Sequence, residues 1–358
     1  GEMSYSTGLR IVEMVEEDVT PSKILTRQAF ENSVILNSAI GGSTNAPIHI
    51  NAIARHVGVK LEIEDWQKVG LGIPLLVNMQ PTGKYLGEDF HRAGGVPAVM
   101  HTLLTAGKLH DSAITVNGKT VAENYAETPT QDTDVIRTYN EPMLENAGFV
   151  VLKGNICDAA VMKTSVISDS FRSQYLDKPG SKNVFEVRAI VFEGPEDYHA
   201  RINDPQLSID VDCILIIRGC GPVGYPGSAE VVNMQPPDSL IRKGVTELPT
   251  LGDGRQSGTS GSPSILNASP ESAVGGGLAL LKTGDMLRVD LNLGTMDVLL
   301  DETELRKRRD QLKTAVIENQ TPWQEMYRNT VGQLSSGGII ELAAKYKKIR
   351  NTIPRHSH

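Results

Sequence analysis

The stretch Val184-Phe185-Glu186-Val187-Arg188-Ala189-Ile190-Val191-Phe192 decides the fold class of the second half of this chain. Valine, isoleucine and phenylalanine occupy most of its positions, and neither Gly nor Pro interrupts it, which predicts a β-strand. Three similar runs, set apart by segments that contain Gly and Pro, are residues 149–155, 213–218 and 286–291. Only a few helical patterns lie between these runs. The second half is therefore predicted to be a β-rich, barrel-like domain.

Two glycine-rich loops accompany these strand runs. The first is Gly219-Cys220-Gly221-Pro222-Val223-Gly224-Tyr225-Pro226-Gly227-Ser228-Ala229-Glu230, and the second is Thr250-Leu251-Gly252-Asp253-Gly254-Arg255-Gln256-Ser257-Gly258-Thr259-Ser260-Gly261. Neither fits a helical or an alternating pattern, so both are predicted to be loops whose backbone bends sharply. Backbone N–H groups of such a loop can bind an anion, and Arg255 adds charge. We interpret the loops as two walls of one site; ordinary surface turns are the alternative.

The first half shows helical patterns interrupted by one short apolar run. Helices are predicted over residues 3–17 and from a cap at Thr26, and the apolar run 73–77 is predicted to be a buried strand. Residues 114–121 predict a hairpin through Asn117-Gly118. This alternation predicts an α/β domain, and the boundary is placed so that residues 1–139 and 140–358 form two domains. The tail, residues 322–348, is predicted to return to helix.

A glycine turn in the first half precedes a helix-forming segment. It reads Ile40-Gly41-Gly42-Ser43-Thr44-Asn45-Ala46-Pro47, and it places Ser43, Thr44 and Asn45 at a helix N-terminus. The exposed N–H groups and the helix dipole favour an anion there. An ordinary N-cap explains the same residues equally well, so the two interpretations stay open at this point.

Composition excludes several classes of function. The 358 residues carry a formal net charge of −8, with no run of Lys and Arg, so we expect no nucleic-acid partner. No apolar run is long enough for a membrane span, and we expect no membrane partner. Three cysteines without CxxC spacing, Cys157, Cys213 and Cys220, predict neither a disulfide framework nor a self-contained zinc site. A reducing cytoplasm fits this usage. Residue 1 is Gly rather than Met, and we expect the chain to be a fragment.

Five groups of residues carry a resemblance to a known family. They are Gly41-Gly42-Ser43-Thr44-Asn45, then Pro81-Thr82-Gly83-Lys84 with His91-Arg92-Ala93-Gly94-Gly95, Leu152-Lys153-Gly154-Asn155, Pro226-Gly227-Ser228-Ala229-Glu230, and Asp253-Gly254-Arg255-Gln256-Ser257-Gly258. Together they resemble the dihydroxy-acid dehydratase and phosphogluconate dehydratase family over essentially the whole chain. Residues 77–81, 230–238 and 354–358 are most similar to family members that act on five-carbon sugar acids. The resemblance implies an α/β N-terminal domain with a parallel sheet, followed by a swivelling, barrel-like C-terminal domain.

The resemblance also implies a reaction and its cofactors. Such enzymes remove water from a 2,3-dihydroxy acid, here an aldonate such as D-xylonate or, alternatively, L-arabinonate, and release a 2-keto-3-deoxy acid. Mg²⁺ and an iron–sulfur cluster, expected to be of the 2Fe–2S type, act as Lewis acids in the family. Matched to the family's motifs, Ser257 is the base and Glu230 a Mg²⁺ ligand. Thr259 lies beside the base, while Arg255, Gly258, Ser43, Thr44 and Asn45 are expected to contact the substrate.

The chain departs from the family in one respect. The family's cluster cysteines, its modified lysine and another acidic Mg²⁺ ligand lie in a segment that would precede Gly1. We therefore expect the cluster ligands to lie outside this chain, and apolar surface on residues 1–139 to be exposed without that segment. A homodimer or homotetramer is expected.

Two other functions are alternatives to the dehydratase. One is a non-catalytic module that binds a sugar acid, although a binder has no need of a base such as Ser257. The other is a hydrolase that uses Ser257 as a nucleophile. No Gly-x-Ser-x-Gly elbow surrounds Ser257, which argues against the hydrolase.

Overall fold

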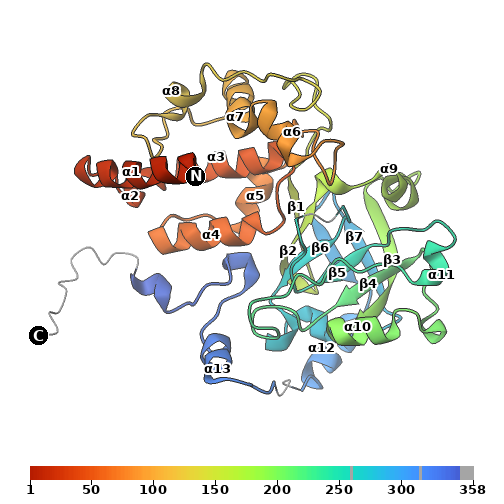
Figure 1. Ribbon diagram of the computed structural model, residues 1–358. Coiled ribbons are helices and arrows are strands. Elements are labelled where there is room, and N and C mark those ends of the chain that lie inside the picture. Colours follow the sequence, from red (N-terminus) through yellow and green to blue (C-terminus); the bar gives the residue numbers. More distant parts are fainter. Residues whose placement is uncertain (259–260, 314–316, 347–358) are drawn as a thin grey trace, which may run out of the picture.

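A helical part lies beside a β-barrel in the computed structural model, which describes residues 1–258, 261–313 and 317–346 (Figure 1). The helices of the first part are α1 (Glu2–Glu16), α2 (Pro21–Ile24), α3 (Arg27–Ala39), α4 (Ala46–Val57), α5 (Ile63–Gly70), α6 (Gly87–Arg92), α7 (Gly95–Thr105) and α8 (Val121–Tyr125). The two predicted N-terminal helices are confirmed as α1 and α3. The Thr26 hydroxyl accepts a hydrogen bond from the Ala29 N–H and so caps α3, as expected.

The prediction of a parallel sheet in the first part is wrong for this chain. Residues 1–148, all of which the structure describes, contain no strand. The apolar run 73–77 is extended and buried, but it forms only single bridges, Leu75 to Leu144 and Val77 to Ile136. Its partner segment turns repeatedly, at the Asn140-Glu141-Pro142 stretch and at Asn146 with φ of 54°, so no continuous ladder forms. The predicted hairpin is reduced to one bridge, Ile114 to Thr120.

The second part is a closed barrel of eight strands, in agreement with the prediction. The strands are β1 (Phe149–Gly154), β2 (Cys157–Lys163), β3 (Val184–Phe192), β4 (Cys213–Ile217), β5 (Thr250–Gly252), β6 (Ile265–Ser269), β7 (Met286–Asp290) and β8 (Thr295–Val298). Their order around the barrel is β1-β2-β6-β5-β4-β3-β7-β8. The β3–β4, β4–β5, β5–β6 and β1–β8 pairs are parallel, and the other pairs are antiparallel.

Short helices connect and follow the strands. They are α9 (Asp169–Phe171), α10 (Pro195–Arg201), α11 (Asp238–Ile241), α12 (Glu302–Asp310) and α13 (Pro322–Arg328). The predicted helical tail is only partly present, because α13 ends at Arg328 and the described chain then forms two short 3₁₀ turns, Leu334–Ser336 and Ala343–Tyr346. Gly337 and Gly338, both at positive φ, prevent a continuous helix there.

Two apolar clusters stabilise the barrel from inside and outside. The inner cluster includes Leu152, Met162 and Leu287, and the outer cluster joins the barrel to the first part through Trp66 of α5 and Phe149 of β1. The rings of this last pair meet edge to face with centroids 5.8 Å apart. Burial of each large apolar side chain contributes roughly 1.5–3 kcal/mol, so this shared cluster holds the two parts together.

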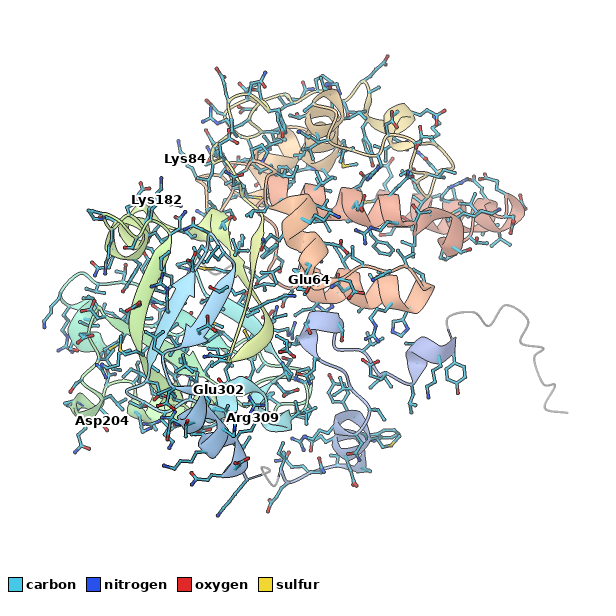
Figure 2. The ribbon with its side chains drawn as sticks, turned by 180° about the vertical axis from the view of Figure 1, so that it is seen from behind. Glu64, Lys84, Lys182, Asp204, Glu302 and Arg309 are labelled. Carbon is cyan, nitrogen blue, oxygen red and sulfur yellow. The ribbon has the colours of Figure 1, made fainter. Side chains whose placement is uncertain are left out.

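Polar contacts at the same junction add to this packing. Lys153 of β1 forms an ion pair with Glu64 of α5. Figure 2 shows Glu64 between the helices and the barrel. The C-terminal segment runs along α4, where Arg55 binds Glu341 through two nitrogens at 2.9 and 2.7 Å. This segment therefore bridges the helical part and the barrel (Figure 1).

The helix α1 presents an apolar face to solvent. Its exposed apolar side chains are Met3, Tyr5, Leu9, Ile11, Val12 and Val15. None of its residues is buried. Among the described residues, no helix combines the length and the apolar character that a membrane crossing requires.

Candidate functional site

Three loops meet at one edge of the barrel. The glutamate loop, residues 219–230, follows β4, and the serine loop, residues 253–258, follows β5. Because β4 and β5 are parallel neighbours, with Ile217 opposite Gly252, their carboxyl ends lie side by side and deliver both loops to the same place. The third is the asparagine loop, residues 41–45, which joins α3 to α4. The structure thus supports the interpretation of the two glycine-rich loops as neighbours, although residues 250–252 of the second are strand rather than loop.

Asp253 ties the two barrel loops together from within. Its carboxylate is fully buried and accepts hydrogen bonds from the N–H groups of Gly219 and Cys220, at 3.1 and 2.9 Å. It also accepts from the N–H and the hydroxyl of Ser272, at 2.9 and 2.7 Å. Four donors satisfy this buried charge, so Asp253 is a structural anchor rather than a group available to substrate.

Glu271 also anchors the glutamate loop, through Val223 and Gly224. It is buried, and its carboxylate accepts from the N–H groups of Val223 and Gly224, at 2.9 and 2.8 Å, and from the Gln333 amide at 3.1 Å. Burial raises the pKa of Glu271, against the effect of these hydrogen bonds. Gly221 is needed for this contact, because a Cβ there would come within 2.5 Å of the carboxylate.

Arg255 uses its guanidinium to hold loops. Its Nε donates to the Ser228 carbonyl at 2.7 Å, and its other nitrogens donate to the Gly227 carbonyl and to Asn45 Oδ1, at 3.3 and 3.2 Å. Arg255 also lies 3.8 Å from Glu230 Oε1. Contact between Arg255 and the substrate stays a prediction. The contacts with the loops show that Arg255 orients the glutamate loop and places a positive charge at the site.

The asparagine loop turns its side chains toward the barrel. Asn45 Nδ2 donates to Glu230 Oε1 at 2.5 Å, and the Thr44 hydroxyl donates to the Gln256 carbonyl at 3.1 Å. The Asn45 side chain makes no capping hydrogen bond to α4. The Asn45 side chain is therefore not an ordinary N-cap, and these two residues hold the asparagine loop against the barrel. The Ser43 hydroxyl accepts from the Asn45 N–H and stabilises the turn.

Ser257 lies where the serine and asparagine loops touch. The next residue, Gly258, packs so closely on the asparagine loop that a Cβ there would lie 2.7 Å from Ser43 Oγ. Ser257 is half-buried, and Gln256 before it is buried and donates to Ser264 Oγ at 2.7 Å. This packing fixes the backbone on both sides of Ser257. Thr259, the other predicted catalytic residue, lies outside the described residues.

Comparison with known proteins identifies the family. The dihydroxy-acid/6-phosphogluconate dehydratase C-terminal model matches residues 134–338, and the corresponding N-terminal model matches residues 1–124. The chain belongs to the dihydroxy-acid/6-phosphogluconate dehydratase family. The resemblance inferred from the five groups of residues is thereby confirmed.

Three individual relatives show how similar the chain is to members of this family. D-xylonate dehydratase of Caulobacter vibrioides is 58% identical over 358 residues, which is 100% of this chain and 60% of the relative. L-arabinonate dehydratase of Rhizobium leguminosarum is 44% identical over 306 residues, covering 86% of this chain and 51% of the relative. Dihydroxy-acid dehydratase of Ignicoccus hospitalis is 35% identical over 336 residues, covering 94% and 58%. The chain thus spans between half and three-fifths of the length of these relatives.

Glu230 fits a Mg²⁺ site in this member of the dehydratase family. Its side chain is exposed at the meeting point of the three loops, where its carboxylate and nearby amide and carbonyl oxygens are hard ligands of the kind that Mg²⁺ prefers. Within the described ranges, no three His, Cys, Asp or Glu side chains cluster closely enough to hold a metal ion. Glu230 would therefore supply a single protein carboxylate to the ion.

The cysteines do not fit an iron–sulfur cluster. Cys157, Cys213 and Cys220 are all free and buried. Burial raises the pKa of Cys157 to about 12 and that of Cys213 to about 11, and it also raises the pKa of Cys220. A cluster is held by several thiolates that lie close together, and among the described residues no three His, Cys, Asp or Glu side chains lie close enough to hold a metal ion.

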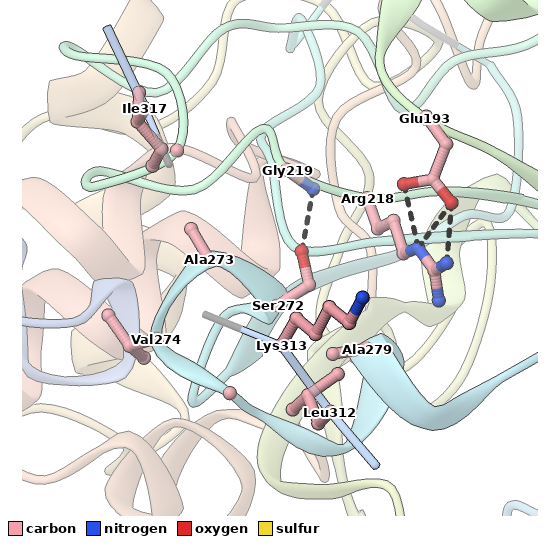
Figure 3. Close-up of a pocket in the computed structure, with 12 residues that line it drawn as sticks. Glu193, Arg218, Gly219, Ser272, Ala273, Val274, Ala279, Leu312, Lys313 and Ile317 are labelled. Carbon is pink, nitrogen blue, oxygen red and sulfur yellow. Dashed lines mark hydrogen bonds and ion pairs between the residues drawn. The ribbon is translucent and has the colours of Figure 1, made fainter. Parts of the chain in front are cut away.

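A pocket of about 410 Å³ borders the glutamate loop at Gly219 and Gly224 (Figure 3). It is lined by Glu193, Arg218, Gly219, Gly224, Ser272, Ala273, Val274, Gly275, Ala279, Leu312, Lys313 and Ile317. In this pocket the Arg218 guanidinium donates hydrogen bonds to the Glu193 carboxylate and to the carbonyls of Leu278 and Leu281. None of the predicted site residues lines this pocket, so we place the site at the meeting point of the three loops.

Sequence reasoning missed three buried charged residues that contact the loops of the site, Asp253, Glu271 and Lys163. Asp253 stands in the motif Asp253-Gly254-Arg255-Gln256-Ser257-Gly258, which does not show its role, and Glu271 stands in no motif. The available signals were an acid that directly follows an apolar strand, at Asp253, and a lysine at the end of one, at Lys163. Neither signal indicates which groups the side chain binds, because those groups are brought close only when the chain folds.

Replacement of Asp253 by Asn is expected to lower the free energy of unfolding by roughly 1–3 kcal/mol, because the amide would turn an N–H group toward the donors that now meet a carboxylate. Denaturation in urea measures this change. Asp158→Asn, at an exposed position of β2, is the control and should stay within about 0.5 kcal/mol of the parent. Equal effects of the two substitutions would contradict the anchoring role.

Proposed function

We propose that this chain forms part of a sugar-acid dehydratase that converts a 2,3-dihydroxy acid such as D-xylonate into a 2-keto-3-deoxy acid. The observation that carries the proposal is the convergence of the three loops, which brings Ser257, Glu230 and Asn45 to one edge of the barrel. The 58% identity to a D-xylonate dehydratase supports the choice of substrate.

Ser257 is assigned the role of base. In the reaction the C2–H bond breaks and its proton passes to the alkoxide of Ser257, which becomes a hydroxyl. The C3–O bond breaks, and the leaving hydroxide takes a proton from that hydroxyl to become water, which restores the alkoxide. The resulting enol takes a proton from solvent at C3 and loses the proton of its C2 hydroxyl to solvent, which gives the 2-keto-3-deoxy acid. A serine hydroxyl is a weak base at its ordinary pKa, so positive charge must lie near it. Arg255, held two residues away by the glutamate and asparagine loops, supplies such charge.

Glu230 is assigned to Mg²⁺, with Asn45 and Arg255 fixing the direction of its carboxylate. When bound, Mg²⁺ supplies the positive charge that stabilises negative charge developing on the substrate's carboxylate and C2 oxygen. Ser43, Thr44 and Gly258 shape the adjacent wall and are proposed to contact the substrate, together with Thr259, which is outside the described residues.

The iron–sulfur cluster expected for the family is not assigned to residues of this chain. The three cysteines are buried and do not form a metal-holding group among the described residues, so we propose that the cluster ligands lie in sequence outside these 358 residues. The exposed apolar face of α1 supports this proposal, since such a face is typical of a surface that another segment covers. A homodimer or homotetramer, a cytoplasmic location and the domain boundary at residue 139 remain predictions.

Two alternatives remain as outcomes of the test. L-arabinonate is the second substrate, supported by the 44% identity to an L-arabinonate dehydratase. A non-catalytic sugar-acid-binding module is the alternative from another class of function, and a binder has no need of a base such as Ser257.

The deciding experiment compares the 358-residue chain with the longer protein that we expect to contain it. Both are purified without air and assayed with Mg²⁺ on D-xylonate and L-arabinonate, by the formation of 2-keto-3-deoxy acid. The longer protein is expected to prefer D-xylonate, and the chain alone to show no turnover. Binding of sugar acid without turnover by the longer protein would identify a binding module instead. Turnover by the chain alone, with stoichiometric iron and sulfide, would show that the cluster ligands lie within this chain.

A further inference from the structure

A buried lysine lies at the edge of the proposed site without a carboxylate partner. Lys163 is the last residue of β2, and only 3% of its surface is exposed. Its Nζ donates a hydrogen bond to the Gly41 carbonyl at 2.7 Å. In the parts of the chain that the structure describes, no salt bridge to Lys163 is found. An ammonium group has three donors, so this charge is only partly compensated.

Burial without a counter-ion is unfavourable for a charged group. Loss of hydration lowers the pKa of Lys163 to about 8, and no neighbouring charge opposes this effect. An apolar side chain of similar length at this position would avoid that cost. Ionisable groups with strongly shifted pKa values cluster at functional sites.

The position of Lys163 connects it to the asparagine loop. Gly41, which it holds, has φ of 62° and begins the turn that leads to Ser43. A Cβ at Gly41 would lie 2.9 Å from Leu75, so the turn passes close to the core of the first part. Beyond the turn, Ser43 packs on Gly258, and Asn45 binds Glu230. The loop is therefore attached to the barrel at both ends, by Lys163 at the first and by Glu230 at the second.

Two further polar groups surround the same turn. The hydroxyls of Ser165 and Thr82 are buried, and no hydrogen-bond partner for either is found among the described residues. The Cβ position of Gly41 lies 3.7 Å from Ser165 Oγ and 4.0 Å from Thr82 Oγ1. Neither hydroxyl holds the turn, so the hydrogen bond from Lys163 is the polar contact that fixes Gly41 to the barrel.

We propose that Lys163 is a positioning residue of the dehydratase site. Its ammonium group fixes the first end of the asparagine loop, and the loop in turn holds Asn45 against Glu230 and Ser43 against the backbone next to Ser257. Lys163 acts through this loop. The inference rests on the proposed function. It adds a residue of β2, a strand that holds none of the predicted site residues.

The test separates positioning from simple support of the fold. In the longer protein that contains this chain, Lys163→Met removes the charge and the donor but keeps the length of the side chain. We expect kcat to fall by about ten- to a hundredfold, since a small displacement of catalytic groups has effects of that size. We expect Tm to stay the same or rise, because a buried unpaired charge is removed. Hydrogen exchange at residues 41–45 should become faster.

Two further variants complete the design. Lys163→Arg keeps the charge and a donor, and it should recover part of kcat. Lys153→Met, on the neighbouring strand β1, removes an exposed lysine that pairs with Glu64, and it should leave kcat unchanged. A fall in Tm that accompanies the fall in kcat in Lys163→Met would show a purely structural lysine, and unchanged kcat would show that the loop does not depend on it.

Failure of the proposed function gives a different result. In that case the protein without substitutions would show no turnover with any aldonate. Hydrogen exchange and Tm of the Lys163 variants would still report whether the lysine holds the loop. Unchanged exchange at residues 41–45 in Lys163→Met would then overturn the positioning role.

Discussion

Ser257→Ala is expected to lower kcat by about a thousandfold or more, because the substitution removes the group that takes the C2 proton. The fold should persist, since the backbone around Ser257 is held by other contacts. Gln256 is fixed by Ser264, and Gly258 packs on Ser43. The measurement is the rate of 2-keto-3-deoxy acid formation from D-xylonate by the longer protein, together with circular dichroism and Tm.

A neighbouring serine provides the matched control for this experiment. Ser262 lies five residues further along the chain and contacts Ser264 Oγ at 3.2 Å. Ser262→Ala should retain turnover close to that of the parent. If Ser257→Ala also retains it, Ser257 takes no part in proton transfer, and the base must be sought elsewhere among the residues of the three loops.

Glu230→Gln is expected to lower kcat on the order of a hundredfold at a fixed, moderate Mg²⁺ concentration, and to raise the Mg²⁺ concentration needed for half-maximal activity. The neutral amide is a weaker ligand than the carboxylate. Its NH₂ group also conflicts with the Asn45 amide, which now donates to Glu230 Oε1. A titration with Mg²⁺, followed by turnover and by calorimetry, measures both effects.

Glu193→Gln is the control for the loss of a carboxylate. Glu193 pairs with Arg218 in the pocket that borders the glutamate loop, and neither Asn45 nor Arg255 lines that pocket. Its replacement should leave the Mg²⁺ titration as in the parent. An unchanged titration in Glu230→Gln would instead assign Glu230 a structural role, as the partner of Asn45 and Arg255 alone.

Local sequence was sufficient for the elements that depend on residue type. The runs that became β1, β3, β4 and β7 contain Val, Ile and Phe in lengths that only a strand accommodates, and their positions agree with the structure to within about one residue. The strands β2, β5, β6 and β8 were missed because they are short or rich in Ala, Asn and Thr. The run 73–77 was predicted as a strand on the same grounds, yet its partner segment bends too often to form a ladder.

The sequence by itself determined the family, the barrel-like second part and the loops that carry Ser257, Glu230 and Asn45, because motifs and composition are local properties. The tertiary structure alone decided the closing order of the strands and the contact of the asparagine loop with the barrel. It also decided the roles of Asp253, Glu271 and Lys163. A buried charge is defined by its partners, and those partners lie far away along the chain, as Gly41 does from Lys163.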